Sequence, residues 1–127
     1  MGLTKKRPVF LNLLQIRLPV TGVVSILHRV SGVVLALCVP LLIYLFDLSV
    51  RGPEGYAQAL DMLAHPVVKL LATLGLWMLG YHALNGVRVL LIDIDIGVQK
   101  PAARRSAWWV HGGATLILLL AIAVLWR

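Results

Sequence analysis

VVKLLATLGLWMLGYHALNGVRVLLI, residues 67–92, is long enough and apolar enough to cross a lipid bilayer as one helix. A spanning helix needs about 20 largely apolar residues, each adding about 1.5 Å of rise. His82 lies deep inside this stretch, and an imidazole in hydrocarbon loses the water that satisfied its ring nitrogens. An intramembrane histidine is therefore a candidate functional residue whose partner has to be found.

Two more segments meet the same criterion, residues 23–48 and residues 108–126. The chain of 127 residues is 60% hydrophobic and 13% charged, which is too apolar for a soluble domain of this size. The sequence predicts an all-α integral membrane protein whose anchor domain, residues 21–127, has three transmembrane helices. Residues 1–20 are basic, and we expect them to lie along the membrane surface.

The net charge of +7 first suggests a nucleic-acid partner, but the cations gather at the predicted helix ends and not on one soluble face. We therefore expect membrane lipid as a partner and no nucleic acid. The positive-inside rule places the N-terminus in the cytoplasm and the C-terminus outside. The basic residues on the predicted inner side are Lys5, Lys6, Arg7, Arg17, Lys100, Arg104 and Arg105.

Prolines mark several expected boundaries. Thr21 is a plausible N-cap of the first helix, and Pro40 predicts a kink in its outer half. Pro53 and Glu54 resemble the first turn of a short surface helix, which the dipeptide at residues 65–66 would stop. We expect this short helix to lie at the outer interface of the membrane.

Ser25, His28 and Arg29 follow one another at i, i+3 and i+4, so they share one face of the first helix. Arg29 is about two turns from the helix start, roughly 12 Å, and thus near the inner membrane surface. Its planar guanidinium favours anionic or carbonyl oxygens as partners. An arginine that reaches toward water, beside a serine bonded to its own helix, is an equally open reading.

His82 and Gly86 stack on one face of the second helix, which leaves room for a flat group beside the imidazole. Neutral imidazole ligates haem iron, and a b-type haem in a helix bundle needs no cysteine. The haem propionates would then need cations such as His28, Arg29 or Arg88. A histidine that simply hydrogen-bonds a neighbouring helix is the commoner alternative.

His111 is a rival ligand, but Trp108 places it near the interface, and we interpret it as structural. His65 precedes a proline in the outer loop and is expected to be solvated. A small transporter or a plain membrane scaffold is a further alternative. A transporter would need a carboxylate at mid-membrane, whereas Asp47, Asp93 and Asp95 lie at helix ends.

Four motifs together carry a family resemblance: RPV at residues 7–9, SILHRVS at residues 25–31, HALNGVR at residues 82–88, and Asp93. With these motifs the chain resembles the cytochrome b subunits of succinate dehydrogenase (complex II), the larger of two membrane anchors. The spacing from Arg-Pro to Ser-x-x-His-Arg-x-Ser is far more specific than a lone histidine.

The resemblance implies a heterotetramer in which a flavoprotein oxidises succinate and an iron–sulfur subunit carries the electrons. Two anchors then hold haem b and the ubiquinone site, and the chain alone has no catalytic activity. His82 would be one axial ligand of the haem iron, with the other from the second anchor, and His28 and Arg29 would face the propionates. The quinone-binding residues implied by position are Ser25, Arg29, Leu18 and Ile26.

The chain departs from the family pattern at Val89, Ile92 and Asp95, which affects local contacts at the inner end of the second helix. The anchor of a quinol:fumarate reductase is a related alternative that the anchor sequence does not separate from the first. The N-terminus lacks an Arg/Ser-rich amphipathic transit segment, which favours a bacterial inner membrane over a mitochondrial one. A trimer of heterotetramers is also left open.

Overall fold

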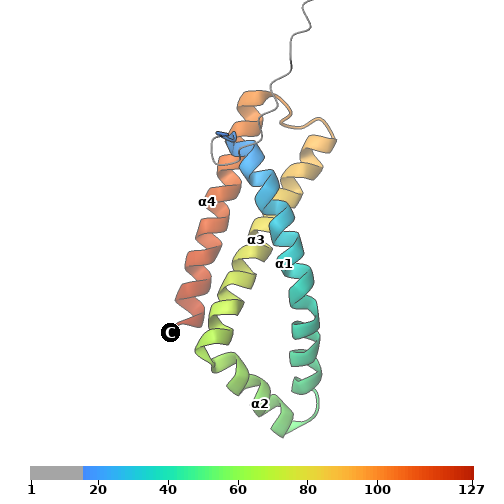
Figure 1. The fold of residues 1–127 in the computed structure, drawn as a ribbon, viewed down its shortest axis with the longest axis vertical. Coiled ribbons are helices and arrows are strands. Elements are labelled where there is room, and N and C mark those ends of the chain that lie inside the picture. The colour runs from blue at the N-terminus through green and yellow to red at the C-terminus, as the bar shows by residue number, and fades with distance from the viewer. Residues whose placement is uncertain (1–15) are drawn as a thin grey trace, which may run out of the picture.

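The computed structural model describes residues 16–127, which form helices and no strand. The helices are α1 (Val20–Ser49), α2 (Pro53–Ala64), α3 (Pro66–Asp93) and α4 (Lys100–Leu125). Helices α1, α3 and α4, of 30, 28 and 26 residues, are long and apolar enough to cross a membrane, which confirms the three predicted spans. Figure 1 shows these three helices as a bundle, with the short α2 joining α1 to α3 at one end.

The expected surface helix between the first two spans is α2, and both α2 and α3 begin with a proline. Proline suits the first turn of a helix because its missing N–H would have no partner there. His65 caps α3, because its Nδ1 accepts the Val67 N–H at 3.2 Å. This exposed histidine is therefore part of the helix boundary as well as solvated.

Helix α1 begins at Val20, and Pro19 is its N-cap residue. The Pro19 carbonyl accepts the first helical bonds, from Gly22 N at 2.8 Å and Val23 N at 3.1 Å, so Thr21 lies inside the helix instead of capping it. The helix continues through Pro40 without a break.

Helix α4 begins at Lys100, eight residues before the expected start at residue 108. Pro101 favours initiation there, and the alanines that follow it are the best helix formers. The preceding loop turns at Asp95 and Gly97, which have φ angles of 62° and 80°. Aspartate tolerates this left-handed region better than most residues, so Asp95 suits the turn.

Small residues let α3 and α4 approach closely. A Cβ added to Gly80 of α3 would lie 2.5 Å from Ile117 Cδ1, and one added to Gly113 of α4 would lie 2.8 Å from Leu84 Cδ1. Without a hydrophobic driving force in lipid, such close backbone contact is the main source of helix association. The buried cluster joins all three long helices and comprises Val24 of α1, Tyr81 of α3, and Ala107, Val110 and Ala114 of α4.

Polar side chains join α3 to α4 at both ends of the bundle. Arg88 donates from Nε to Ser106 Oγ at 2.9 Å and from Nη2 to the Ala103 carbonyl at 3.2 Å. At the other end, Trp126 Nε1 donates to the buried Thr73 Oγ1 at 3.0 Å. From the sequence, Arg88 was a candidate to bind a haem propionate. In the structure its guanidinium binds α4.

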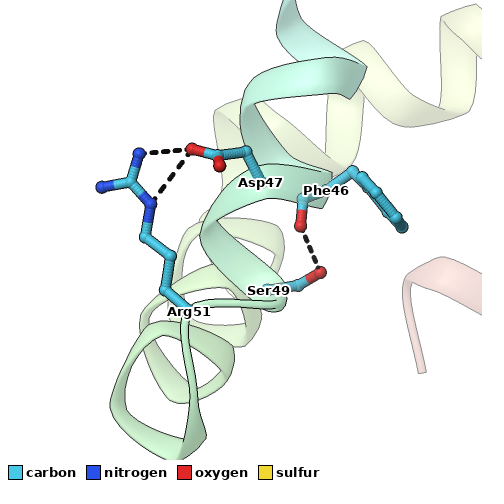
Figure 2. A network of polar contacts seen from close by, with 4 residues as sticks. All are labelled: Phe46, Asp47, Ser49 and Arg51. Carbon is cyan, nitrogen blue, oxygen red and sulfur yellow. Dashed lines mark hydrogen bonds and ion pairs between the residues drawn. The ribbon is translucent and has the colours of Figure 1, made fainter.

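The C-terminal end of α1 carries two local contacts, drawn in Figure 2. Arg51 pairs with the Asp47 carboxylate through Nε and Nη2, and Ser49 Oγ donates to the Phe46 carbonyl at 2.7 Å. The hydrogen bonds from Arg51 to Asp47 raise the pKa of the guanidinium, which stays charged. Because both partners of this ion pair are exposed, it contributes little to stability.

The α3–α4 contact predicts that Gly80→Ala destabilises the bundle by about 1–3 kcal/mol, because the new methyl group would overlap Ile117. Gly75→Ala is the matched control, since a Cβ there meets nothing within 4 Å and gains the same helix propensity. The thermal midpoint of the chain in its assembled complex should fall for Gly80→Ala alone. Equal midpoints for the two variants would contradict this packing.

Candidate functional site

Helices α1 and α3 meet at two stacked histidines. His28 of α1 and His82 of α3 have ring centroids 4.2 Å apart and planes inclined by 16°. The approach depends on Gly32, because a Cβ there would lie 3.2 Å from His82 Cε1. The structure thus brings together the two histidines singled out in the sequence.

Hydrogen bonds across this contact determine which nitrogen of His82 carries the proton. Ser31 Oγ donates its one hydrogen to the His28 carbonyl at 2.7 Å, so it acts as an acceptor toward His82 Nδ1, 3.1 Å away. The His28 carbonyl, 3.2 Å from Nδ1, can only accept. Nδ1 is therefore the protonated nitrogen, and Nε2 keeps a free lone pair. His82 Nε2 makes no hydrogen bond within residues 16–127.

Ser31 is fully buried, and sequence reasoning did not assign it a role. It follows His28 by three residues, so its hydroxyl reaches the His28 carbonyl within the same helix. That local bond leaves the oxygen facing α3 as an acceptor. The three-residue spacing from His28 to Ser31 predicts the hydrogen bond within α1. The contact of Ser31 with His82 depends on how α1 and α3 cross.

The Nε2 atom of His28 is buried and has no hydrogen-bond partner. Within residues 16–127 it is the one buried side-chain nitrogen or oxygen atom of which this is true. A buried unpaired polar atom costs about 1–3 kcal/mol, so this nitrogen calls for a partner outside residues 16–127. A Cβ on Gly86 would lie 3.8 Å from it. The space expected beside Gly86 for a flat group is therefore occupied by the His28 ring in this structure.

Ser25 and Arg29 lie together on α1, with Arg29 Nη2 donating to Ser25 Oγ at 3.3 Å. Leu18 and Ile26 are each 45% exposed, and the Leu18 side chain lies 4.0 Å from where a Gly22 Cβ would be. These residues share one side of the start of α1. Ser25, Ile26 and Arg29 form an open face of α1, and Leu18 also borders a groove toward α4.

His111 of α4 contacts a different set of residues. Its Nδ1 lies 3.4 Å from Tyr81 Oη, and its ring packs against the edge of Tyr81 and beside Trp108. The Tyr81 contact joins α3 to α4, the Trp108 contact lies within α4, and His111 makes no hydrogen bond to His28 or His82. The structural interpretation of His111 stays a prediction.

Residues 16–127 contain no group of three or more His, Cys, Asp or Glu side chains that could hold a bare metal ion. The α1–α3 contact offers two imidazoles to a ligand. His82 has a free lone pair at Nε2, and His28 has a buried Nε2 without a hydrogen-bond partner. This donor set fits a metal that brings most of its ligands with it, such as the iron of a haem.

Comparison with known proteins identifies the family. Residues 4–122 match the family described as succinate dehydrogenase/fumarate reductase transmembrane subunit. The chain is 33% identical over 122 residues to the succinate dehydrogenase cytochrome b556 subunit of Coxiella burnetii, covering 95% of this chain and 98% of that protein. It is 27% identical over 118 residues to the protein of the same name from Paracoccus denitrificans, covering 93% and 91%.

A third relative is the succinate dehydrogenase hydrophobic membrane anchor subunit of Archaeoglobus fulgidus, 29% identical over 96 residues, with 76% of this chain and 77% of that protein covered. The matched region includes the α1–α3 contact and most of α4. The chain therefore belongs to the family of transmembrane subunits of succinate dehydrogenases and fumarate reductases.

Proposed function

We propose that this chain is the cytochrome b anchor subunit of a succinate:quinone oxidoreductase, with His82 as one axial ligand of haem b. The family match and the names of its relatives support the anchor role. The name cytochrome b556 in two of those relatives supports a b-type haem. The anchor serves the enzyme as a subunit and has no catalytic activity alone.

The pair of acceptors at His82 Nδ1 is the observation that carries the haem proposal. A haem-ligating histidine presents one unprotonated nitrogen to iron and donates its other N–H to a nearby acceptor, which fixes the ring. His82 has this arrangement, because Nδ1 donates toward the His28 carbonyl and Ser31 Oγ while Nε2 is free. Haem b, when bound, supplies a one-electron centre within the membrane.

His28 and Arg29 are proposed to bind the haem propionates. The unpaired, buried Nε2 of His28 would gain a partner in a carboxylate oxygen, which removes its desolvation cost. Arg29 has donors left after its single bond to Ser25, since a guanidinium offers five N–H groups. Both residues lie toward the end of α1 that carries the predicted cytoplasmic charges.

Ser25 and Arg29 are also proposed to bind ubiquinone, with Leu18 and Ile26 as the apolar wall. Ser25 can donate a hydrogen bond to a quinone carbonyl, and Arg29 can stabilise the negative charge that develops as electrons arrive. Their open face on α1 supports a site completed by the iron–sulfur subunit and the second anchor.

The second anchor is proposed to donate the other axial haem ligand, and a flavoprotein completes the heterotetramer. We place the complex in a bacterial inner membrane with the N-terminus in the cytoplasm, following the distribution of basic residues. A trimer of such heterotetramers is compatible with this arrangement. The anchor of a quinol:fumarate reductase is the second candidate, since the matched family includes both enzymes.

For the haem ligand, we expect the assembled complex with His82→Ala to lose its b-type absorbance or show an altered haem spectrum. A reduced-minus-oxidised spectrum with a haem assay measures this. His111→Ala is the control, because His111 packs against Tyr81 and makes no hydrogen bond to His28 or His82, so its loss should leave the spectrum unchanged. An unchanged spectrum and haem content in His82→Ala would refute the assignment.

For the Nδ1 hydrogen bond, Ser31→Ala should retain haem but raise its midpoint potential by roughly 40 mV, the equivalent of about 1 kcal/mol for one lost hydrogen bond. A hydrogen-bond acceptor at Nδ1 makes Nε2 a stronger electron donor to iron, which favours the ferric state. Loss of the Ser31 hydroxyl therefore favours the ferrous state. Ser49→Ala is the matched control, with the same 2.7 Å bond to the carbonyl three residues before it (Figure 2). Redox titration would contradict the proposal if both variants kept the parental potential.

For the quinone site, Arg29→Leu should lower succinate-to-ubiquinone transfer by about 100-fold, because charge on the reduced quinone loses its partner. Ser25→Ala should lower the same rate by a smaller factor. Succinate-dependent reduction of an artificial dye by the flavoprotein should persist in both. Arg127→Leu, at the opposite end of the bundle, is the control. Equal losses in both assays would indicate failed assembly and not a quinone site.

A further inference from the structure

A groove of about 930 Å³ lies between the start of α1 and the start of α4. Pro19, Val20 and Val23 form the wall on the α1 side, and Trp108 and His111 lie on the α4 side. Figure 1 shows the beginning of α1 beside the first half of α4, at the end of the bundle that carries the α3–α4 loop. Leu18 of the proposed quinone wall also borders this groove, whereas His28, His82, Ser25, Ile26 and Arg29 do not line it.

The groove is basic at one end. Lys100 and Arg104 line it and share one stripe of α4 with Trp108 and His111, at i, i+4, i+8 and i+11. Among residues 16–127, no acidic side chain lines the groove. Neither cation makes a hydrogen bond or ion pair with another residue in the 16–127 range. The first turn of α4 has no acidic residue and no side-chain cap, so its positive dipole end adds to the charge.

The length of α4 places this basic end at the level of lipid headgroups. Its 26 residues span about 39 Å, whereas the hydrocarbon core of a bilayer is about 30 Å thick. Trp108 lies two helical turns farther along, where interfacial tryptophans are common. The groove therefore extends from cationic side chains at headgroup depth to apolar side chains at acyl-chain depth.

The groove lies on a different side of α1 from the proposed quinone face. Val20, which lines the groove, precedes Arg29 by nine residues, which corresponds to opposite faces of a helix at 100° per residue. Ser25, Arg29 and His82 are not among the lining residues. The two sites meet at Leu18, but an occupant held by Lys100 and Arg104 lies on the α4 side of α1, away from Arg29.

We propose that this groove binds an anionic phospholipid of the cytoplasmic leaflet. The lipid phosphate lies against Lys100 and Arg104, and an acyl chain packs along Val20, Val23 and Trp108. Basic pockets between transmembrane helices on the cytoplasmic side suit such headgroups, since each cation adds to the attraction of the anionic surface. A zwitterionic lipid carries no net charge and gains little from the two cations.

The test uses the assembled complex in non-ionic detergent, with native mass spectrometry to count bound phosphatidylglycerol or phosphatidylcholine of the same chain length. Lys100→Gln/Arg104→Gln should weaken phosphatidylglycerol binding by about 30-fold, since each basic residue near the surface contributes about a fivefold increase. Phosphatidylcholine binding should be unchanged. Arg105→Gln is the matched control, because Arg105 neighbours Arg104 but does not line the groove.

Retention of phosphatidylglycerol at parental affinity in the double variant would overturn the proposal. An equal loss in Arg105→Gln would do the same, because it would indicate a diffuse surface charge and not a built site. If another subunit covers the groove, the parental complex will show no preference for phosphatidylglycerol, which also overturns the proposal.

Discussion

The His82 imidazole of α3 donates its Nδ1 hydrogen toward the His28 carbonyl of α1, and the rest of the proposed site depends on that bond. It joins the two helices, orients the ring and fixes the proton on Nδ1. Ser31 strengthens the arrangement, because its hydroxyl hydrogen is already committed to the same carbonyl. As a result His82 Nε2 keeps the lone pair that iron requires.

The two interhelical contacts of α3 differ in kind. Toward α4, close packing at Gly80 and the hydrogen bonds of Arg88 make a structural contact. Toward α1, Gly32 brings the backbone close to His82, and the contact is made of imidazoles and a buried hydroxyl. One side of α3 thus holds the bundle together, and the other side presents groups with unused bonding capacity.

The three spans and the two histidines were predictable from sequence, because hydropathy sets helix length in a bilayer and an imidazole in that setting is rare. The stacking of His28 on His82 and the role of Ser31 were not predictable, because both depend on how α1 crosses α3. Arg88 was assigned as a candidate for a propionate from its charge alone, yet it binds Ser106 across a contact that periodicity does not reveal.

The central claim is that His82 of this chain binds haem iron through Nε2 while Nδ1 remains bonded to α1. A cryo-EM map of the assembled complex, at a resolution that separates the ring atoms, tests it most directly. We expect continuous density from iron to His82 Nε2, with Nδ1 facing the His28 carbonyl and Ser31 Oγ. Iron bound by Nδ1, or by His28 or His111 in place of His82, would contradict it.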